Sequence, residues 1–349
     1  QRRCPCVENR NPSTQQTMPY ESELTIALEA VRQASALCST AQAGLTSSEH
    51  MDKADKSPVT VADYGAQALV LNTLAKSFPN DPAVGEEDAG DLRKEENEVL
   101  FSKIVSYVQK IDPSMDQASI LESIDRGGHS GGTNGRFWTL DPIDGTKGFL
   151  RGQQYAVALA LIDNGEVVLG VLGCPNLPVD PAAPDGEKGC LLYAVKGQGS
   201  FQAPLSNLSK AISVTCDSIS DASEAVFCES VESGHTAHGR SAVIGELLES
   251  KATPFRMDSQ CKYAAVSRGQ ASIYLRLPTR PGYEEKIWDH AAGCIVLTEA
   301  GGKVADTFGN PLNFSLGRTL KLNKGIVATS AGVFDSVIKA VVKSGQIDS

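Results

Sequence analysis

A strand that runs into a proline between two aspartates constrains this chain more than any other feature of its sequence. Residues Phe137–Leu140 form an apolar run that is typical of a buried strand. Pro142 lacks a backbone N–H, so we expect the strand to end at Asp141. Asp141 and Asp144 then lie on a tight turn, with the backbone carbonyl of Ile143 between them. Such a turn offers hard oxygen ligands of the kind that Mg²⁺ prefers.

The residues after this turn favour an anion. Gly145 allows a ligand to approach the backbone closely, and Thr146 suits the start of a helix whose free N–H groups attract negative charge. Oxygen ligands beside such a helix start fit Mg²⁺ together with a phosphate ester. Taken alone, the aspartates are equally consistent with a solvated turn, because Asp and Pro are common turn residues. Thr146 likewise suits a simple helix cap.

Composition limits the partners of the chain. Its 349 residues suffice for two domains, and a net charge of -10 without a long basic run argues against a nucleic-acid polymer. No apolar stretch approaches the roughly 20 residues of a membrane span, so no membrane partner is expected. An anionic small substrate therefore has to be met by local cations or by bound metal.

Residues 1–18 form a polar leader. The leader contains Arg2, Arg3 and Arg10, whereas Glu8 is its single acidic residue. This balance is typical of the end of an organelle transit peptide. If the leader is instead a remnant of cloning, we expect a cytoplasmic location.

Periodicity differs between the two halves of the remaining chain. Residues 19–205 begin with two helices, one at about 20–46 and one that starts at a cap on Thr60 or Asp63 and runs to about 78. They later contain a strong hairpin signal at Asp163–Gly165. Residues 206–349 alternate strands with helices, which is typical of an α/β domain. We place the domain boundary near residue 205, where the composition turns polar.

Three local details complete this outline. Gly44 is expected to end the first helix, and Asp112–Gly135 is expected to be a loop-rich insertion. Trp288–Ala300 is expected to be a helix that a following glycine terminates.

Two cysteines border neighbouring strand-like runs. Cys174 ends one run and Cys190 begins the next, so a hairpin of these strands would bring the thiols together. A reversible disulfide is one interpretation, and a pair of reduced, buried thiols is the other.

Acidic residues recur where predicted elements begin or end, and none has a basic helical partner nearby in the sequence: Asp63, Glu86, Glu87, Asp141, Asp144 and Asp289. Simpler interpretations exist, because Asp63 suits a helix N-cap and Asp289 suits the first turn of a helix. Glu86 and Glu87 likewise suit a solvated loop. If all six gather in one place, however, they repel one another unless cations lie among them, which indicates a site for several Mg²⁺ ions.

The order of these acidic segments resembles the Mg²⁺-dependent, lithium-sensitive phosphatase superfamily that includes inositol monophosphatase. Four longer strings resemble 3′(2′),5′-bisphosphate nucleotidases, particularly those of plants: Ser57–Tyr64, Gly135–Tyr155, Asp258–Tyr263 and Glu285–His290. The resemblance covers about residues 19–344. It implies an α/β fold with an α+β first half, built as a layered αβαβα sandwich of the inositol monophosphatase and fructose-1,6-bisphosphatase type. The active site is then expected between the two halves.

The resemblance also implies roles for single residues. It implies two to three Mg²⁺ ions with these ligands: Glu86, Asp141, the carbonyl of Ile143, Asp144 and Asp289. Asp63 and Thr146 match the pair that activates the attacking water, with Glu87 as a supporting carboxylate. The implied substrate-binding positions are Thr146, His235, Ser259, Lys262, Arg276 and Asp289.

The cations among these positions suit a second phosphate. Their simpler interpretations are a solvated helix residue for Lys262 and an edge-strand charge for Arg276.

The activity that the resemblance implies is removal of the 3′-phosphate of adenosine 3′,5′-bisphosphate, giving AMP and phosphate. The sulfated form of this nucleotide and 2′-phosphate isomers are further substrates to be expected. An inositol polyphosphate 1-phosphatase is the alternative enzyme, although Asp258–Tyr263 and His235 suit a nucleotide better than a cyclitol. A catalytically inactive nucleotide sensor would lack a metal ligand or one of Asp63 and Thr146, and none of these is missing.

A plant-type resemblance also bears on location and assembly. Together with the leader, it implies a chloroplast or mitochondrial enzyme. It further implies a monomer or a redox-sensitive homodimer, with Cys174 and Cys190 as the candidate redox pair.

Overall fold

The computed structural model of the chain describes four segments: residues 19–47, 57–231, 238–280 and 282–347. The leader and His235 lie outside the described residues, so organelle targeting and the role of His235 stay predictions.

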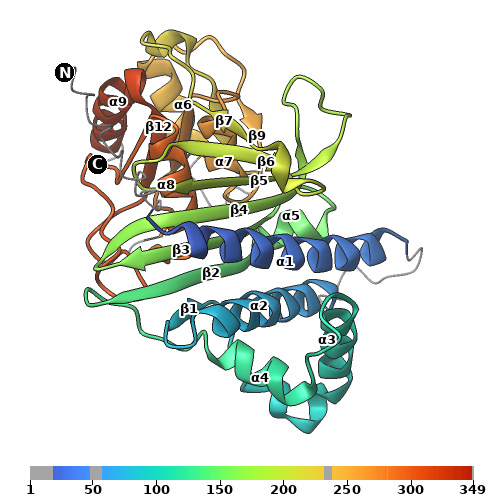
Figure 1. Cartoon of the computed structure of the whole chain (residues 1–349). Coiled ribbons are helices and arrows are strands. Elements are labelled where there is room, and N and C mark those ends of the chain that lie inside the picture. Colours follow the sequence, from blue (N-terminus) through green and yellow to red (C-terminus); the bar gives the residue numbers. More distant parts are fainter. Residues whose placement is uncertain (1–18, 48–56, 232–237, 281, 348–349) are drawn as a thin grey trace, which may run out of the picture.

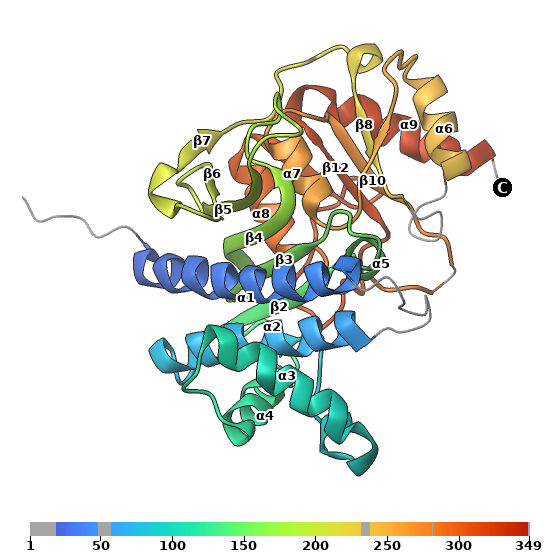
Figure 2. The same cartoon turned by 90° about the vertical axis from the view of Figure 1, so that its right-hand side faces the viewer.

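The described residues form five layers in which helices and sheets alternate (Figures 1 and 2). A seven-stranded sheet and a five-stranded sheet are separated by one helical layer and covered on their outer faces by two others. These helical layers are α1 (Glu21–Ser47) with α2 (Ser57–Ser77), α7 (Cys261–Ser267) with α8 (Ala291–Glu299), and α6 (His238–Leu247) with α9 (Phe334–Ile347). The predicted αβαβα sandwich is thereby confirmed.

The first sheet keeps its strands in chain order: β1 (Ala83–Gly85), β2 (Arg136–Asp144), β3 (Ala156–Asp163), β4 (Glu166–Pro178), β5 (Lys188–Val195), β6 (Ser200–Pro204) and β7 (Ile212–Val214). β1 and β2 are parallel, and all later neighbours are antiparallel. The hairpin predicted at Asp163–Gly165 joins β3 to β4. Asn164 and Gly165 have φ values of 50° and 83° there, as a tight hairpin turn requires.

Strand β3 shows how the first sheet packs against a helical layer on each of its faces. Val157 and Leu159 belong to the core beneath α1 and α2, whereas Ala158 and Ala160 belong to the core that contains α8. Successive side chains of a strand point to opposite faces, so an uninterrupted apolar run places a core on both sides. Small residues face α8, and a Cβ on Gly170 of β4 would lie only 2.9 Å from an α8 carbonyl.

The second sheet has the strand order β11-β12-β10-β8-β9. Its strands are β8 (Phe227–Glu229), β9 (Phe255–Arg256), β10 (Ile273–Arg276), β11 (Gly302–Ala305) and β12 (Ile326–Ser330). β8, β9 and β10 run parallel, and β12 pairs antiparallel with both of its neighbours. Strands and helices alternate from β8 to α8, as predicted, and β11 and β12 then follow each other before α9. No helix in the described part of the chain has the length and apolarity needed to cross a bilayer.

Two local expectations are wrong. Helix α1 continues through Gly44 to Ser47, because packing on α2 outweighs the cost of about 1 kcal/mol for an interior glycine. The segment expected to be loop-rich contains α4 (Gln117–Asp125), which follows α3 (Glu98–Ile111). Asp116 caps α4 by accepting a hydrogen bond from the backbone N–H of its third residue. The division near residue 205 stays a prediction, and β7 beyond it still pairs with the first sheet.

Candidate active site

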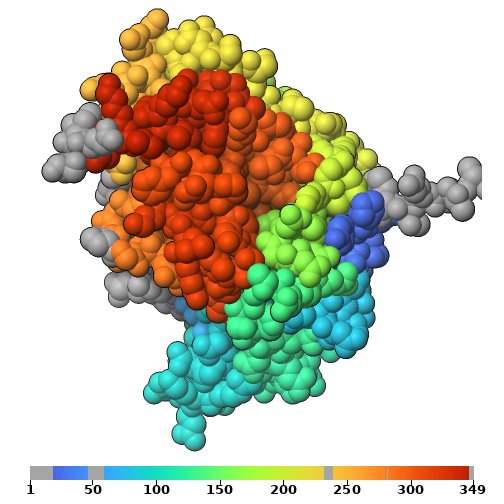
Figure 3. Space-filling view, turned by 90° about the vertical axis from the view of Figure 1, so that its left-hand side faces the viewer, coloured from blue at the N-terminus to red at the C-terminus, as the bar shows by residue number. Residues whose placement is uncertain are grey.

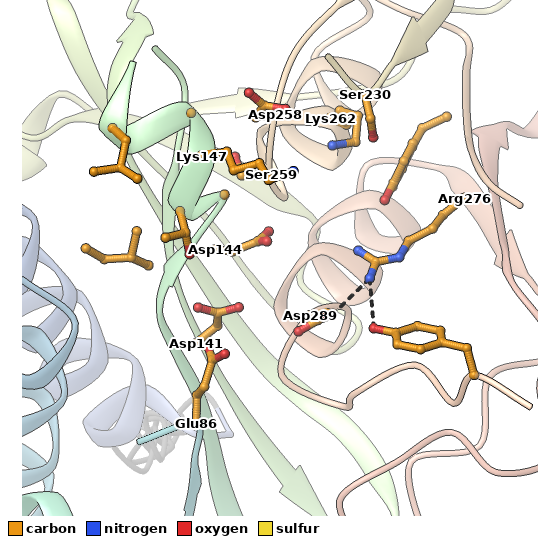
Figure 4. Close-up of a pocket in the computed structure, with 17 residues that line it drawn as sticks. Glu86, Asp141, Asp144, Lys147, Ser230, Asp258, Ser259, Lys262, Arg276 and Asp289 are labelled. Carbon is orange, nitrogen blue, oxygen red and sulfur yellow. Dashed lines mark hydrogen bonds and ion pairs between the residues drawn. The ribbon is translucent and has the colours of Figure 1, made fainter. Parts of the chain in front are cut away.

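A cavity of about 450 Å³ lies between the two halves of the described chain (Figure 4). The first half supplies a wall of carboxylates from Glu86, Asp141 and Asp144. Facing them, the second half supplies the cations of Lys262 and Arg276. The predicted metal ligands Ile143 and Asp289 and the predicted binding residues Thr146 and Ser259 also line this cavity.

Strand β2 carries two of the acids and does not end where predicted. It continues to Asp144, and its pairing with β3 shifts register between Asp141 and Asp144. Pro142 lies inside this irregularity, where its missing N–H removes no ladder hydrogen bond. The expected strand end at Asp141 is therefore wrong, because a bulge rather than a turn accommodates the proline.

Helix α5 (Thr146–Leu150) begins at Thr146, as predicted. Gly145 precedes it with φ 91°, and a Cβ on this glycine would lie 2.8 Å from the Cβ of Ser259. Gly145 therefore lets the two halves meet at the cavity. Ser259 itself has φ 67°, a strained conformation for a residue with a side chain and one that is frequent at binding sites.

Asp63 lies inside α2 rather than at its N-terminus. The helix already includes Ser57, so the N-cap interpretation of Asp63 is wrong. Burial raises the pKa of the Asp63 carboxyl well above its ordinary value, and the charges of Glu87 and Glu86 raise it further. This interaction places Asp63 beside the carboxylate wall, although it does not line the cavity itself.

Glu87 is held through its backbone by a buried glutamine. Gln67 Oε1 accepts from the Glu87 N–H at 3.1 Å, and Gln67 Nε2 donates to the Glu87 carbonyl at 2.7 Å. Burial raises the pKa of the Glu87 carboxyl, and a hydrogen bond from Tyr64 opposes this shift. The solvated-loop interpretation of Glu87 is therefore wrong.

Asp289 lies in a turn before α8, not in the first turn of a helix beginning at Trp288 as predicted. Gln260 fixes this turn, because its side chain donates to the Trp288 carbonyl at 2.8 Å and accepts from the Gly293 N–H at 2.9 Å. The backbone N–H of Gln260 also donates to Asp144 Oδ2 at 2.5 Å. One residue thus connects the acids of the two halves.

The electrostatics of the carboxylate cluster fit a bound cation. Burial, together with repulsion among the acids, raises the pKa of Glu86 to about 8 and that of Asp289 to about 6. Burial also raises the pKa of Asp141 well above its ordinary value. Asp141 Oδ1 is buried and has no hydrogen-bond partner among the described residues. An unpaired buried carboxylate oxygen among other acids is what a divalent cation satisfies, so this donor set fits Mg²⁺.

A neighbouring acid cluster is already neutralised. Glu285, Asp289 and His290 offer ligand atoms within 4.8 Å of one another. However, Arg276 Nε lies 2.8 Å from Glu285 Oε2, and Arg276 Nη2 lies 3.3 Å from Asp289 Oδ2. His290 contacts Glu285 at 3.1 Å and the Tyr263 hydroxyl at 3.0 Å. The Arg276 guanidinium takes the place of a metal cation in this cluster. Of its three members, only Asp289 also lines the cavity, where it can bind a metal ion together with the carboxylate wall.

Of the two cations on the opposite wall, Lys262 is buried and Arg276 is half-buried. Lys262 Nζ donates to the Met257 carbonyl at 3.3 Å and lies 5.0 Å from the centre of the Tyr274 ring, so its interpretation as a solvated residue is wrong. Arg276 lies on β10, which has a neighbour on each side, so its interpretation as an edge-strand charge is also wrong. Both cations line the cavity, and Arg276 is paired there with Glu285 and Asp289.

Further cavity residues escaped the sequence reasoning: Lys147, Ser230, Asp258, Tyr274 and Tyr283. Asp258 pairs with Arg151, and the Tyr283 hydroxyl accepts from Arg276 Nη2 at 3.3 Å. Asp258 could have been predicted as a site residue, because it directly precedes the predicted binding residue Ser259. Ser230 and Tyr283 carry no comparable signal, because only the folding of the second half brings them to the cavity.

Cys174 and Cys190 are direct register partners on β4 and β5. Both are buried and free, and burial raises the pKa of the Cys190 thiol to about 11. The Cys190 thiol donates to the Leu177 carbonyl at 3.3 Å. The disulfide stays a prediction, and a thiol count on the air-oxidised protein that finds every cysteine free would exclude it.

Comparison with known proteins identifies the family of the chain. The model of the inositol monophosphatase family matches residues 20–346. The chain belongs to this family. Enzymes of the inositol monophosphatase family are metal-dependent phosphatases. Among solved structures, the inositol monophosphatase from Thermotoga maritima has a TM-score of 0.60 and 20% identity, covering 93% of this chain and 98% of its own.

Curated relatives within the family are much closer in sequence. A 3′(2′),5′-bisphosphate nucleotidase from Schizosaccharomyces pombe is 45% identical, covering 93% of this chain and 96% of its own. The protein named 3′(2′),5′-bisphosphate nucleotidase 1 from Arabidopsis thaliana is 46% identical with the same coverage. The predicted resemblance to these nucleotidases is confirmed. The emphasis on plants is not, because the fungal relative is about equally similar.

Proposed function

We propose that the chain removes the 3′-phosphate of adenosine 3′,5′-bisphosphate, giving AMP and phosphate. The observation that carries this proposal is one cavity with a carboxylate wall opposite Lys262 and Arg276. A substrate with two phosphates needs metal ligands for the phosphate that reacts and fixed cations for the one that stays. The names of the relatives at 45% and 46% identity support the same substrate.

Five residues would hold two to three Mg²⁺ ions: Glu86, Asp141, Ile143 through its carbonyl, Asp144 and Asp289. Bound Mg²⁺ supplies a water of lowered pKa and positive charge beside the phosphoryl oxygens. The bulge in β2 supports this assignment, because it aims Asp141, Ile143 and Asp144 at the same cavity.

The remaining chemistry belongs to side chains of this chain. Asp63 accepts a proton from the attacking water, and burial raises the pKa of its carboxyl well above the ordinary value, which makes its carboxylate a stronger base. Thr146 orients this water from the start of α5, and Glu87 supports Asp63 through its charge. The water oxygen bonds to phosphorus while the bond from phosphorus to the 3′-oxygen breaks, and the leaving 3′-oxygen takes a proton from solvent water.

The second half holds the rest of the nucleotide in this proposal. Lys262 and Arg276 bind the 5′-phosphate, and the Ser259 hydroxyl donates to it. His235, which lies outside the described residues, is proposed to bind the nucleotide as well. The sulfated nucleotide and 2′-phosphate isomers are further proposed substrates, because they keep the same charged groups. A monomer or redox-sensitive homodimer is a separate proposal, which size-exclusion chromatography with and without reductant tests.

Phosphate release from adenosine 3′,5′-bisphosphate and from inositol 1,4-bisphosphate tests the proposal. We expect Mg²⁺-dependent turnover that prefers the nucleotide and falls when Li⁺ is added. A preference for the inositol ester would keep the metal chemistry and reject the nucleotide roles of Ser259, Lys262 and Arg276. No turnover of either ester would reject the proposed activity.

A further inference from the structure

One arginine of the second half joins the backbones on both sides of the cavity. Arg318 Nη1 donates to the carbonyls of Gly127 at 3.2 Å and His129 at 3.0 Å, and its Nη2 donates to the Gly85 carbonyl at 2.5 Å. All three carbonyls belong to the first half. Figure 3 shows the orange-red surface of the C-terminal half meeting the green surface of the first half. We propose that Arg318 is a positioning residue that sets the separation between the carboxylates of Glu86 and Asp289.

On the first-half side, Arg318 holds the end of β1. Gly85 is the last residue of this strand, and Glu86 follows it directly. The Gly85 N–H also donates to the Gly127 carbonyl at 2.9 Å, so the strand and the neighbouring loop form one unit beneath the guanidinium. The backbone that leads into Glu86 is therefore fixed from the second half by one side chain.

On the second-half side, Arg318 holds the turn that carries Asp289. Its guanidinium carbon lies 4.8 Å from the centre of the Trp288 ring, and Asp289 is the next residue. The Ile287 N–H donates to the Arg318 carbonyl at 3.2 Å. The side chain and the backbone of Arg318 thus both contact the turn that carries Asp289. A shift of this arginine would displace a carboxylate of each half.

The chemistry of the position requires arginine. A guanidinium is planar and has five donors in a fixed fork, so it serves several carbonyls while its face stacks on an indole. A lysine ammonium provides a single point charge without this geometry. Residues that orient ligands from outside the coordination shell typically change metal affinity by about 10- to 100-fold. The inference rests on the proposed metal site, and it adds a residue that is not itself a ligand.

Arg136 provides a matched control. It pairs with Glu23 at 2.7 Å and Asp81 at 2.9 Å, and its guanidinium carbon lies 5.4 Å from the centre of the Phe78 ring. It is as strongly anchored as Arg318 but lies at the opposite end of β2 from Asp144. Loss of Arg136 is expected to lower stability and to leave the geometry of the cavity unchanged.

The test measures Mn²⁺ binding to the full chain by electron paramagnetic resonance, without substrate, together with thermal unfolding in EDTA. We compare the wild type with Arg318→Lys, Arg318→Met and Arg136→Met. Both Arg318 variants are expected to weaken Mn²⁺ binding about 10-fold or more. Arg136→Met is expected to unfold at a lower temperature and to bind Mn²⁺ like the wild type. Arg318→Lys decides the result if Arg318→Met does not fold.

Two results would overturn the inference and leave the proposed function standing. One is unchanged Mn²⁺ affinity in a folded Arg318→Lys protein. The other is an equal loss of affinity in Arg136→Met, which would mean that Mn²⁺ binding follows overall stability. A wild type that binds no Mn²⁺ would overturn the proposed metal site and this inference with it.

Discussion

At the scale of single residues, burial determines what the acids of the site do. Glu86, Asp141 and Asp289 all have raised pKa values, first because the surrounding protein reduces their contact with water and then because nearby acids repel them, although only Asp141 is fully buried. Two of these acids come from the first half and one from the second. The cluster is therefore costly in the metal-free protein, and its cost depends on pH.

The pH dependence of stability follows from Glu86. Its pKa is about 8 in the folded, metal-free chain against an ordinary value of 4.5, so the folded state holds this proton more tightly than the unfolded state. The stability that this group contributes is complete below its ordinary pKa and is lost as pH rises through about 8. We expect the thermal unfolding midpoint in EDTA to fall between about pH 5 and pH 8. Circular dichroism melts at steps of one pH unit measure it.

The control for this prediction is Glu86→Gln, which cannot ionise at that position. The variant should show a smaller fall over the same pH window. A wild-type midpoint that rises from pH 5 to pH 8 in EDTA would contradict the sign of the effect, and an equal slope in the variant would show that Glu86 is not its source.

Lys262 permits a prediction about specificity. Lys262→Met keeps an apolar stem against Tyr274 but removes the charge that faces the cavity. A charged hydrogen bond is worth about 1.5–3 kcal/mol, so KM for adenosine 3′,5′-bisphosphate should rise about 10- to 100-fold. KM for adenosine 3′-monophosphate, which lacks the 5′-phosphate, should change much less. Steady-state kinetics at saturating Mg²⁺ compare the substrates, and equal increases in both KM values would reject the assignment.

Motifs predicted most of the residues of this site but not their partners. Asp141, Asp144 and Thr146 lie close together in sequence, so the motif alone placed them in the same region of the molecule. The ion pair of Arg276 with Glu285 instead requires that the turn before α8 fold back onto β10. Nothing in the local sequence encodes that contact. The same is true of Gln260, whose buried side chain joins α7 to α8.

At the scale of elements, sequence patterns predicted the features that depend on local residues and missed those that depend on other parts of the chain. The hairpin of β3 and β4 was predictable, because its turn residues and periodicity are local. The continuation of β2 past Pro142 was not, because a proline within a strand ordinarily marks its end and the bulge depends on pairing with β3. Helix α4 was missed because the glycines that follow it dominate the composition of its segment.

Gly148 tests how closely α5 must pack. A Cβ at this position would lie 2.2 Å from the Gln154 carbonyl oxygen and 2.9 Å from Asp258 Oδ2. Gly148→Ala should therefore destabilise the protein by about 1–3 kcal/mol and lower activity, because α5 must move away from the cavity.

Gly245 in α6 is the control, since a Cβ there meets nothing within 4 Å among the described residues. Gly245→Ala should be neutral or stabilise by up to about 1 kcal/mol. Urea unfolding of both variants gives the answer, and equal effects would reject the argument.

At the scale of the whole molecule, the site unites two halves that each have their own sheet. Glu86 follows β1 of the first sheet, and Asp289 precedes α8, which packs between the sheets. A cation whose ligands come from both halves binds the assembled protein and not the unfolded chain. Its binding free energy therefore adds to the stability of the whole fold, by about 2.7 kcal/mol at a concentration of 100 times Kd.

Mg²⁺ is accordingly expected to raise the unfolding midpoint of the wild type by several degrees at constant ionic strength. Asp289→Asn should lose most of this rise, because it removes the ligand that the second half supplies while keeping the shape of the side chain. Asp185→Asn removes the same charge from an exposed loop between β4 and β5 and should keep the full rise. Differential scanning calorimetry with and without Mg²⁺ separates the two. A full rise in Asp289→Asn would mean that Mg²⁺ binds the first half alone, and a lost rise in Asp185→Asn would mean that Mg²⁺ acts only through the net charge of -10.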